Sequence, residues 1–274
     1  MSMSSTGGKP LTPERYNWSR RTVREKLQRW AWFLITALVV YWCLSTLDIF
    51  WPWVWDAPAQ MADLLGRMSP PNFTRWNDIL FAMLQTINIA TLATLLALII
   101  ALPAAYLAAQ NTTPGPIGLW LGRFIVVSTR SVNTIIWALL FVAIFGPGAI
   151  AGILAVAFRS VGFIGKLVAE AIEEIDRKPV EAIEATGASR AKVVLYGIVP
   201  QVIPAFFAVA ILRWEVNIRE STVLGLVGAG GIGLILQGAI DTFQWQTVST
   251  VLIAIVIVVV LGEIVSGWLR SRVI

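Results

Sequence analysis

The feature that most limits what this chain can fold into is the stretch from residue 79 to 109, which carries no charged side chain. A helix crosses the roughly 30 Å hydrocarbon core of a bilayer with about 20 mostly apolar residues, since each residue rises about 1.5 Å. The whole chain is 57% hydrophobic and 14% charged, which excludes a water-soluble domain. We predict an all-α polytopic membrane protein of six transmembrane helices, at about 30–47, 79–109, 124–145, 149–167, 199–218 and 248–267.

The chain has one cysteine and no histidine, which removes much of enzyme chemistry. Disulfide frameworks, His/Cys zinc sites and nucleophiles activated by histidine are excluded. Cys43 lies among aromatic and aliphatic residues, so we interpret it as a packed or lipid-facing hydrophobe. We expect no catalytic residue, no metal site and no cofactor bound by this chain.

Lysine and arginine are distributed unevenly between the two sides of the predicted spans. One side holds the basic segment 1–29 and loops with eight further basic residues, whereas the other side holds Arg67 and Arg75. The eight are Arg123, Lys166, Arg177, Lys178, Arg190, Lys192, Arg270 and Arg272. Because basic residues in short loops stay in the cytoplasm, we predict both termini inside a bacterial inner membrane.

This topology divides the chain into three predicted parts. Residues 1–29 form a cytoplasmic basic tail, and residues 30–77 form the first transmembrane helix and an extracytoplasmic loop. Residues 78–274 form the transmembrane core, which includes a cytoplasmic loop at 179–196. In that loop, good helix formers precede Gly187, and Pro200 is suited to start the next span, so two short helices around a sharp turn are predicted. A plain connector lying on the membrane surface is the alternative.

Several charged side chains lie within or at the ends of the apolar spans, where an ionised group costs at least about 2.5 kcal/mol at the helix centre. They are Arg130, Arg159, Arg213, Glu215, Arg219, Glu220 and Glu263. Helical spacing places Arg213, Asn217 and Glu220 on one face and makes Glu215 and Arg219 an i, i+4 pair. These side chains are expected to face protein or a watery cavity.

Two interpretations of these charges stay open. In the first, they line a path for an anionic substrate. The donors would be Arg130, Asn133, Arg213, Asn217 and Arg219. In the second, they form structural ion pairs, which we favour for Glu215 with Arg219. We interpret Arg159 and Glu263 as structural or interfacial.

The glycine-rich segment after the fifth span contains a literal GxGxxG. It follows an apolar helix rather than a strand, so a dinucleotide site is excluded. We predict a tight turn with close packing near the outer surface, formed by Gly228, Gly230, Gly231 and Gly233. Gly165 and Lys166 do not form a P-loop, because Leu167 replaces Ser/Thr, so the chain is not expected to hydrolyse ATP by itself.

The loop at 179–196 resembles the EAA loop of ABC importer permeases. Glu181, Ala182, Gly187 and Pro200 match its pattern, and the sequence departs from it at Ile183, Gly197 and Val199. The resemblance implies a coupling helix that contacts a separate cytoplasmic ATPase. The implied coupling residues are Glu181, Ala182, Glu184, Ala185 and Gly187.

Longer strings, such as RWEVNIREST and SVGFIGKLVAEAIEEID, resemble the permease subunits of phosphonate-type ABC importers (PhnE-like) over residues 78–272. This resemblance implies the fold of MetI-like type I importer permeases and transport of phosphonate or phosphite. It also implies a homodimeric pore, two ATPase subunits that use ATP and Mg, and an extracytoplasmic phosphonate-binding protein. Arg159 occupies a position where histidine is common in this branch, which argues against a substrate role for it.

Other functions remain alternatives. Within the same class, the substrate could be methionine, an amino acid or another oxyanion, because composition does not separate them. A secondary transporter would need coupling-ion ligands and usually an internal repeat, and neither is evident. An intramembrane enzyme would need an acid/base pair that the sequence does not offer.

Overall fold

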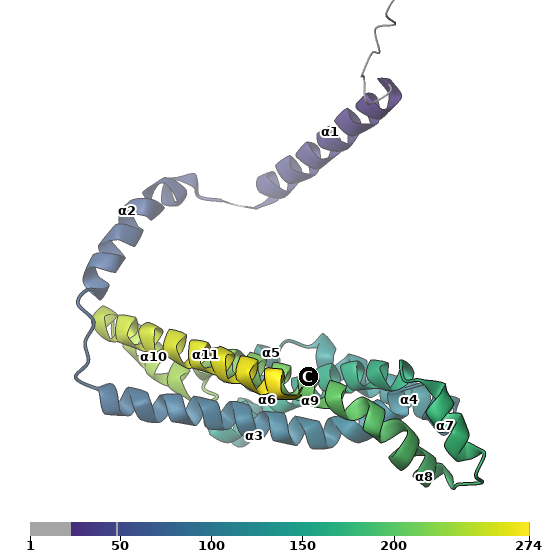
Figure 1. Ribbon diagram of the computed structural model, residues 1–274. Helices are drawn as coiled ribbons and strands as arrows, with labels where there is room; N and C mark the ends of the chain where they lie inside the picture. The colour runs from purple at the N-terminus through teal and green to yellow at the C-terminus, as the bar shows by residue number, and fades with distance from the viewer. Residues whose placement is uncertain (1–22, 48, 274) are drawn as a thin grey trace, which may run out of the picture. The chain divides into compact units, whose positions relative to one another are not determined.

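The computed structural model describes residues 23–47 and 49–273, and within these residues every regular element is a helix (Figure 1). The part of the predicted basic tail that precedes residue 23 lies outside the described residues. The chain divides into two compact units, Met1–Met61 and Ala62–Ile274. The prediction of an all-α fold is confirmed.

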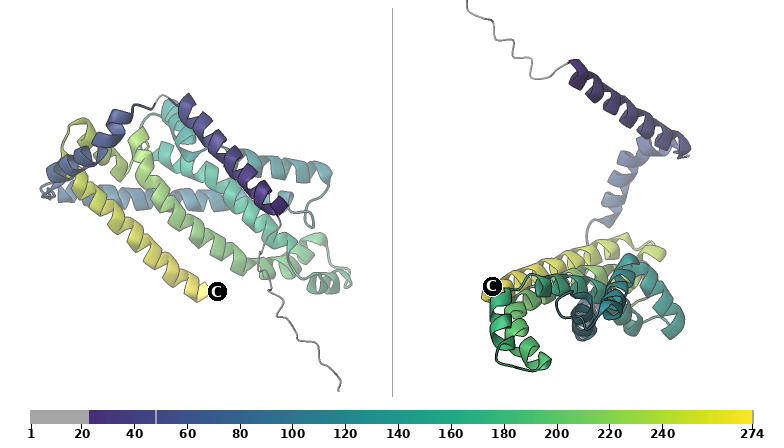
Figure 2. Two further views of the ribbon diagram at one scale, coloured as in Figure 1. Left: turned by 90° about the horizontal axis from the view of Figure 1, so that it is seen from above. Right: turned by 90° about the vertical axis from the view of Figure 1, so that its right-hand side faces the viewer.

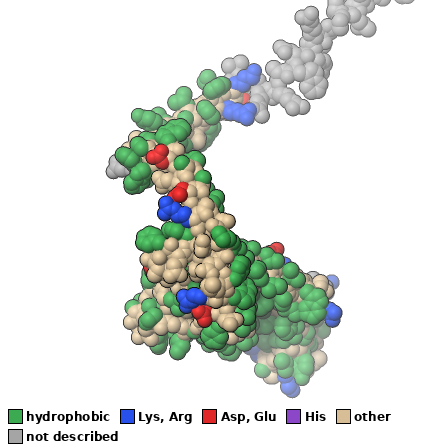
Figure 3. Space-filling view, turned by 90° about the vertical axis from the view of Figure 1, so that its left-hand side faces the viewer, with side chains coloured by type: hydrophobic (Ala, Val, Ile, Leu, Met, Phe, Trp, Pro, Cys, Tyr) green, Lys and Arg blue, Asp and Glu red, His purple; other side chains and the backbone are tan. Residues whose placement is uncertain are grey.

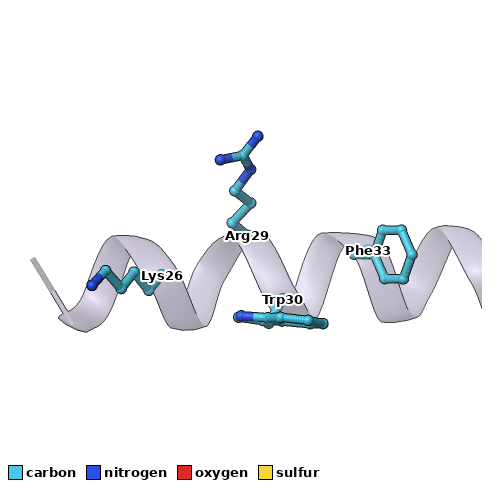
Figure 4. A pocket seen from close by; sticks show the side chains of 4 residues that line it. All are labelled: Lys26, Arg29, Trp30 and Phe33. Carbon is cyan, nitrogen blue, oxygen red and sulfur yellow. The ribbon is translucent and has the colours of Figure 1, made fainter. Parts of the chain in front are cut away.

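The first unit contains α1 (Val23–Thr46) and the start of α2 (Trp51–Met68). Residues Arg24–Thr46 of α1 are long and apolar enough to cross a membrane. At its N-terminal turns, Lys26, Arg29, Trp30 and Phe33 project from different sides of a single helix (Figure 4), so the hollow they border is not an enclosed site. Basic and indole side chains at a helix end are typical of the membrane interface.

The predicted loop between the first two spans contains a helix that the sequence analysis missed, because α2 runs from Trp51 to Met68. Pro52 lies in the first turn, where its missing amide proton is not needed. Good helix formers follow in the second half of the segment, and Arg67 forms an i, i+4 ion pair of 2.7 Å with Asp63.

Three long helices run side by side through the second unit (Figure 1, Figure 2): α3 (Trp76–Ala108), α6 (Ala149–Glu173) and α9 (Val199–Leu224). Their contact faces are rich in small residues. On α3 the buried alanines include Ala90, Ala93, Ala97, Ala101 and Ala105. Small side chains let helix backbones approach closely where lipid gives no hydrophobic driving force for helix association. Many large hydrophobic side chains of this unit are exposed, and few charged side chains appear on the face that Figure 3 shows.

The predicted continuous span at 124–145 is wrong, because the chain breaks there into α4 (Pro116–Ser131) and α5 (Thr134–Phe145), bent by 90°. Val132 and Asn133 are extended, and the Asn133 side chain accepts a hydrogen bond of 3.1 Å from the amide of Ile135. Asparagine favours this N-cap position, which starts a new helix.

Within the described residues, five helical stretches are long and apolar enough to span a membrane, and the bent α4–α5 pair makes a sixth if it is one span. These five to six apolar stretches agree with the predicted architecture of about six transmembrane helices. A 3₁₀ turn (Gly225–Val227) and α10 (Ile232–Asp241) follow α9, and α11 (Trp245–Val273) extends beyond the predicted range at both ends.

Candidate functional site

A cluster of polar side chains joins four helices in the middle of the second unit. We call it the Glu220 cluster, and it consists of Thr94 on α3, Thr134 on α5, Arg159 and Ser160 on α6, and Arg213, Asn217 and Glu220 on α9. Arg213 is 4% exposed. Its Nε donates to Ser160 Oγ at 2.9 Å, and its Nη2 donates to Glu220 Oε1 at 3.2 Å.

The Glu220 carboxylate is the meeting point of three helices. Arg159 Nη1 donates to Oε1 at 2.9 Å, and Thr134 Oγ1 donates to Oε2 at 2.7 Å. The same Arg159 nitrogen lies 2.7 Å from Thr134 Oγ1. Arg159 is 27% exposed and Glu220 18%, so this carboxylate lies at the accessible edge of the cluster, whereas Arg213 lies at its base.

Asn217 is fully buried and extends the cluster to α3. Its Nδ2 donates to Thr94 Oγ1 at 2.8 Å, and its Oδ1 accepts from Ser160 Oγ at 3.0 Å. Burying an amide without partners is costly, and these two bonds remove that cost. In total, two guanidinium groups and one carboxylate give the Glu220 cluster an excess of one positive charge.

A second polar group, the Glu215 cluster, consists of Glu215, Arg219, Ser266 and Arg270 and joins α9 to α11. Glu215 accepts from Arg219 Nη2 at 2.8 Å and from Ser266 Oγ at 2.6 Å, and Arg270 Nη2 lies 3.5 Å away. Arg219 is 45% exposed and Arg270 43%. The i, i+4 pairing of Glu215 with Arg219 that the sequence predicts is therefore present.

The five residues predicted to line a substrate path do not all come together. Arg213 and Asn217 lie in the Glu220 cluster, and Arg219 lies in the Glu215 cluster. Arg130 borders a separate cavity of about 270 Å³ with Arg123 and Lys166. Asn133 caps α5.

Sequence reasoning set Arg159 apart from Arg213, but the structure pairs both with the same carboxylate. It also missed Thr94, Thr134 and Ser160. Each is a hydroxyl residue in an apolar stretch, and Ser160 follows a charged residue directly. Polar residues inside spans tend to face the protein interior, so their presence was a usable indication.

The segment predicted to form two short helices does so. We call residues 177–198 the helix–turn–helix segment, and it contains α7 (Arg177–Glu184), α8 (Arg190–Val193) and a π-helical turn (Val194–Ile198). Gly187 has a φ of +75°, a conformation that favours glycine, and its amide donates to the Glu184 carbonyl at 2.9 Å. The predicted coupling residues Glu181, Ala182, Glu184, Ala185 and Gly187 are all exposed.

The inner face of α7 packs on the π-helical turn through two of the residues that depart from the EAA pattern. A Cβ atom at Gly197 would lie 3.3 Å from Val180 Cα and 3.4 Å from Ile183 Cδ1. The branched Ile183 thus occupies the space that the missing side chain of Gly197 leaves. The two departures fit each other.

Side chains at both ends fasten the helix–turn–helix segment to neighbouring helices. Gln201 on α9 accepts from the Asp176 amide at 3.1 Å and donates to the carbonyls of Asp176 and Gly197 at 3.2 and 2.7 Å. Arg190 Nη2 donates to the carbonyls of Thr112 and Thr113, between α3 and α4, at 2.8 and 2.9 Å. The segment is therefore rigidly attached and can transmit displacement.

The glycine-rich segment forms a tight turn between α9 and α10. Gly228, Gly230 and Gly231 have φ values of +84°, +86° and +77°. The Gly228 carbonyl accepts from the Gly148 amide at 2.9 Å, and the Ile232 amide donates to Thr86 Oγ1 at 2.8 Å, which ties the turn to α6 and α3. Gly233 lies directly against Gly225, where a side chain would collide with backbone.

Comparison with known proteins finds relatives among transport permeases. The chain is 42% identical over 212 residues to the phosphite transport system permease protein PtxC of Stutzerimonas stutzeri, covering 77% of each chain. It is 36% identical over 267 residues to the phosphate-import permease protein PhnE of Mycolicibacterium smegmatis, covering 96% of this chain and 49% of that protein.

Solved structures resemble the fold. A chain from inward-facing conformations of the MetNI methionine ABC transporter matches with a TM-score of 0.60 and 22% identity, over 72% of this chain and 96% of that one. The family model described as "binding-protein-dependent transport system inner membrane component" matches residues 101–274. The chain belongs to this family of inner-membrane components of binding-protein-dependent transport systems.

Proposed function

We propose that this chain is the membrane-spanning permease subunit of an ABC importer and that it carries a small tetrahedral phosphorus oxyanion of the phosphite, phosphonate or phosphate class. Relatives named as phosphite and phosphate-import permeases support this substrate class. The observation that carries the proposal is the Glu220 cluster, which holds an excess positive charge among four apolar helices. An anion that passes there meets guanidinium donors.

The substrate-pathway residues in this proposal are Arg213 and Asn217, with Arg159 added from the structure. Arg213 and Asn217 lie at the base of the cluster, where fixed donors act on an anion without reorganising. Three other predicted pathway residues lie outside the Glu220 cluster: Arg130, Asn133 and Arg219. In this proposal they would contact the substrate before or after it passes the cluster.

Energy would reach the permease through the helix–turn–helix segment. Its exposed residues, including Glu181 and Gly187, would contact a cytoplasmic ATPase, and the hydrogen bonds of Arg190 and Gln201 would carry the motion to α3, α4 and α9. We propose a homodimer with two ATPase subunits, which use ATP and Mg, and an extracytoplasmic phosphonate-binding protein. Both termini would be cytoplasmic in a bacterial inner membrane.

The test is ATPase activity in liposomes that contain this chain with its ATPase and binding protein. Phosphite- or phosphonate-loaded binding protein should stimulate hydrolysis at least fivefold. Glu181→Lys and Gly187→Asp should abolish the stimulation, because the first reverses a charge on the exposed face and the second places a side chain at a positive φ. Asp241→Lys, an exposed charge reversal at the end of α10, is the matched control and should keep it.

The possible results test the substrate, the coupling role and the importer assignment separately. Complex formation with stimulation by a methionine- or amino-acid-loaded binding protein alone would retain the permease and replace the substrate. Normal stimulation in both loop variants would refute the coupling role. If no ATPase binds the chain, the importer assignment is wrong.

A further inference from the structure

We propose that Glu220 is a built-in counter-anion: its carboxylate occupies the anion-binding position of the pathway, and a transported oxyanion passes by displacing it. This inference rests on the proposed function, since it assigns a specificity-determining residue to that pathway. It concerns the single acidic member of the Glu220 cluster, which sequence reasoning placed on the helix face of Arg213 without giving it a role.

The first argument is the set of groups around the carboxylate. Arg159, Arg213 and Thr134 donate to its two oxygens over distances of 2.7 to 3.2 Å, and they come from α6, α9 and α5. Guanidinium and hydroxyl donors are also the groups that recognise oxygens of phosphorus oxyanions. Thr134 is the first residue of α5, and a helix N-terminus adds a partial positive charge. The carboxylate is thus held by a site that would suit an exogenous oxyanion.

The second argument is that the carboxylate does not saturate the site. Two guanidinium groups face one carboxylate, so one positive charge remains uncompensated within the cluster. Among the described residues, the buried Nε of Arg159 finds no hydrogen-bond acceptor. A buried donor without an acceptor is unfavourable. An oxyanion with three or four oxygens could satisfy more donors than the two oxygens of Glu220.

The third argument is that Glu220 can leave without disturbing the base of the site. Arg213 is fixed from other directions, by Ser160 Oγ at 2.9 Å and by the ring of Phe163, whose centroid lies 5.1 Å from its guanidinium carbon. Glu220 lies at the accessible edge of the cluster. A change of side-chain rotamer can therefore remove the carboxylate while Arg213 remains in place.

A counter-anion that belongs to the protein, such as the Glu220 carboxylate, has a functional advantage in a permease. Two guanidinium groups without a counter-charge would bind an oxyanion tightly and release it slowly. Conduction requires binding that is favourable enough for entry and weak enough for exit. The Glu220 carboxylate returns when the substrate leaves, and it compensates the arginines between transport events.

The experiment measures binding of inorganic phosphite and phosphate to the purified full-length chain in phosphatidylcholine nanodiscs, by titration calorimetry. Glu220→Gln should bind phosphite at least tenfold more tightly than the parent chain. Glu215→Gln is the matched control, since Glu215 also lies on α9 between two arginines, but those are exposed. Its affinity should stay within twofold of the parent.

Two further variants keep the test decisive if Glu220→Gln does not fold. Glu220→Asp keeps the charge but retracts the carboxylate by one methylene, and it should give an intermediate gain of about threefold. The double variant Arg159→Gln/Glu220→Gln should lose the gain, because it removes one of the two arginine donors along with the carboxylate. A parent-like phosphite affinity in a folded Glu220→Gln or Glu220→Asp variant would overturn the proposal, as would an equal gain in Glu215→Gln.

The failure of this inference and the failure of the proposed function are distinguishable. If the liposome assay shows import of another solute, a gain of phosphite affinity in Glu220→Gln still supports the counter-anion. If phosphite import is demonstrated and the affinity does not change, Glu220 is a structural ion-pair partner and the proposed function stands.

Discussion

The carboxylates of the Glu220 and Glu215 clusters have the same kinds of partner in different surroundings. Each cluster centres on a glutamate of α9 that forms ion pairs with two arginines and accepts a hydrogen bond from one hydroxyl side chain. The arginines of the Glu220 cluster are 4% and 27% exposed, whereas those of the Glu215 cluster are 45% and 43% exposed. The difference lies in how deeply the protein buries the cations.

This difference decides what each cluster can do. Exposed ion pairs are screened, and they contribute about 0 to 1 kcal/mol. In a buried pair the loss of one partner leaves a charge without compensation, which costs about 3 to 5 kcal/mol. The same imbalance gives a buried cluster a stronger attraction for an incoming anion. Burial of the arginines therefore predicts an ion-pair link between α9 and α11 for the Glu215 cluster and an anion site for the Glu220 cluster.

The largest effect is expected from Arg213→Gln compared with Arg270→Gln. Both arginines contact a glutamate of α9 through Nη2, at 3.2 and 3.5 Å. Arg213→Gln should lower the unfolding free energy in detergent by about 3 kcal/mol and reduce transport at least tenfold, because it removes the buried hydrogen bonds to Glu220 and Ser160, and a bond to a charged group contributes about 1.5 to 3 kcal/mol. Arg270→Gln should cost less than about 1 kcal/mol. Equal losses in thermal unfolding would show that burial does not distinguish the clusters.

A smaller effect is expected from the neutral members, Asn217 and Ser266. Asn217→Ala removes two interhelical hydrogen bonds, to Thr94 and Ser160, and should cost about 1 to 2 kcal/mol, given about 0.6 kcal/mol per bond in membrane proteins and a small cavity. Ser266→Ala removes one bond to Glu215 and should cost about 0.6 kcal/mol. Chemical unfolding of the two variants in the same detergent would measure this difference, and a larger loss for Ser266→Ala would contradict the ranking.

The smallest effect is the dependence on salt. Raising the ionic strength from about 0.05 M to about 0.5 M shortens the screening length several-fold and acts mainly on exposed charges. The stability difference between Arg270→Gln and the parent should therefore vanish at high salt. The difference for Arg213→Gln should persist. A Glu215 cluster that keeps its full contribution in high salt would be more shielded than its exposure indicates.

Features that depend on local spacing could be predicted from the sequence. The alignment of Arg213 with Glu220 on one helix face, the pairing of Glu215 with Arg219 and the turn at Gly187 all follow from helix periodicity or from backbone conformation. The apolar runs likewise predicted the long helices, although several extend by a few residues beyond the apolar stretch. The residues at these helix ends are polar, like the loops that follow, so hydropathy does not show where the helix stops.

Features that depend on which helices meet could not be predicted. Arg159 lies 61 residues from Glu220 in the sequence, and nothing in the fourth span indicates that it faces α9. The bend at Asn133 was missed because the apolar runs on either side were read as one span, although residues 128–134 (STRSVNT) are mostly polar and an asparagine followed by threonine is a plausible helix start. The bend is what brings Thr134 to the Glu220 carboxylate.

The contact between Ile183 and Gly197 has a consequence for how such sequences can diverge. The space beside Gly197 is bordered by Val180 and by the end of the Ile183 side chain, so a larger residue at 197 would need a smaller residue at 183 and a shift of α7 at Val180. Relatives with a large residue at the equivalent of Gly197 should carry a small one at the equivalent of Ile183. Residue size at the two positions should therefore covary among relatives. The variability of either position considered alone would make it look less constrained than it is.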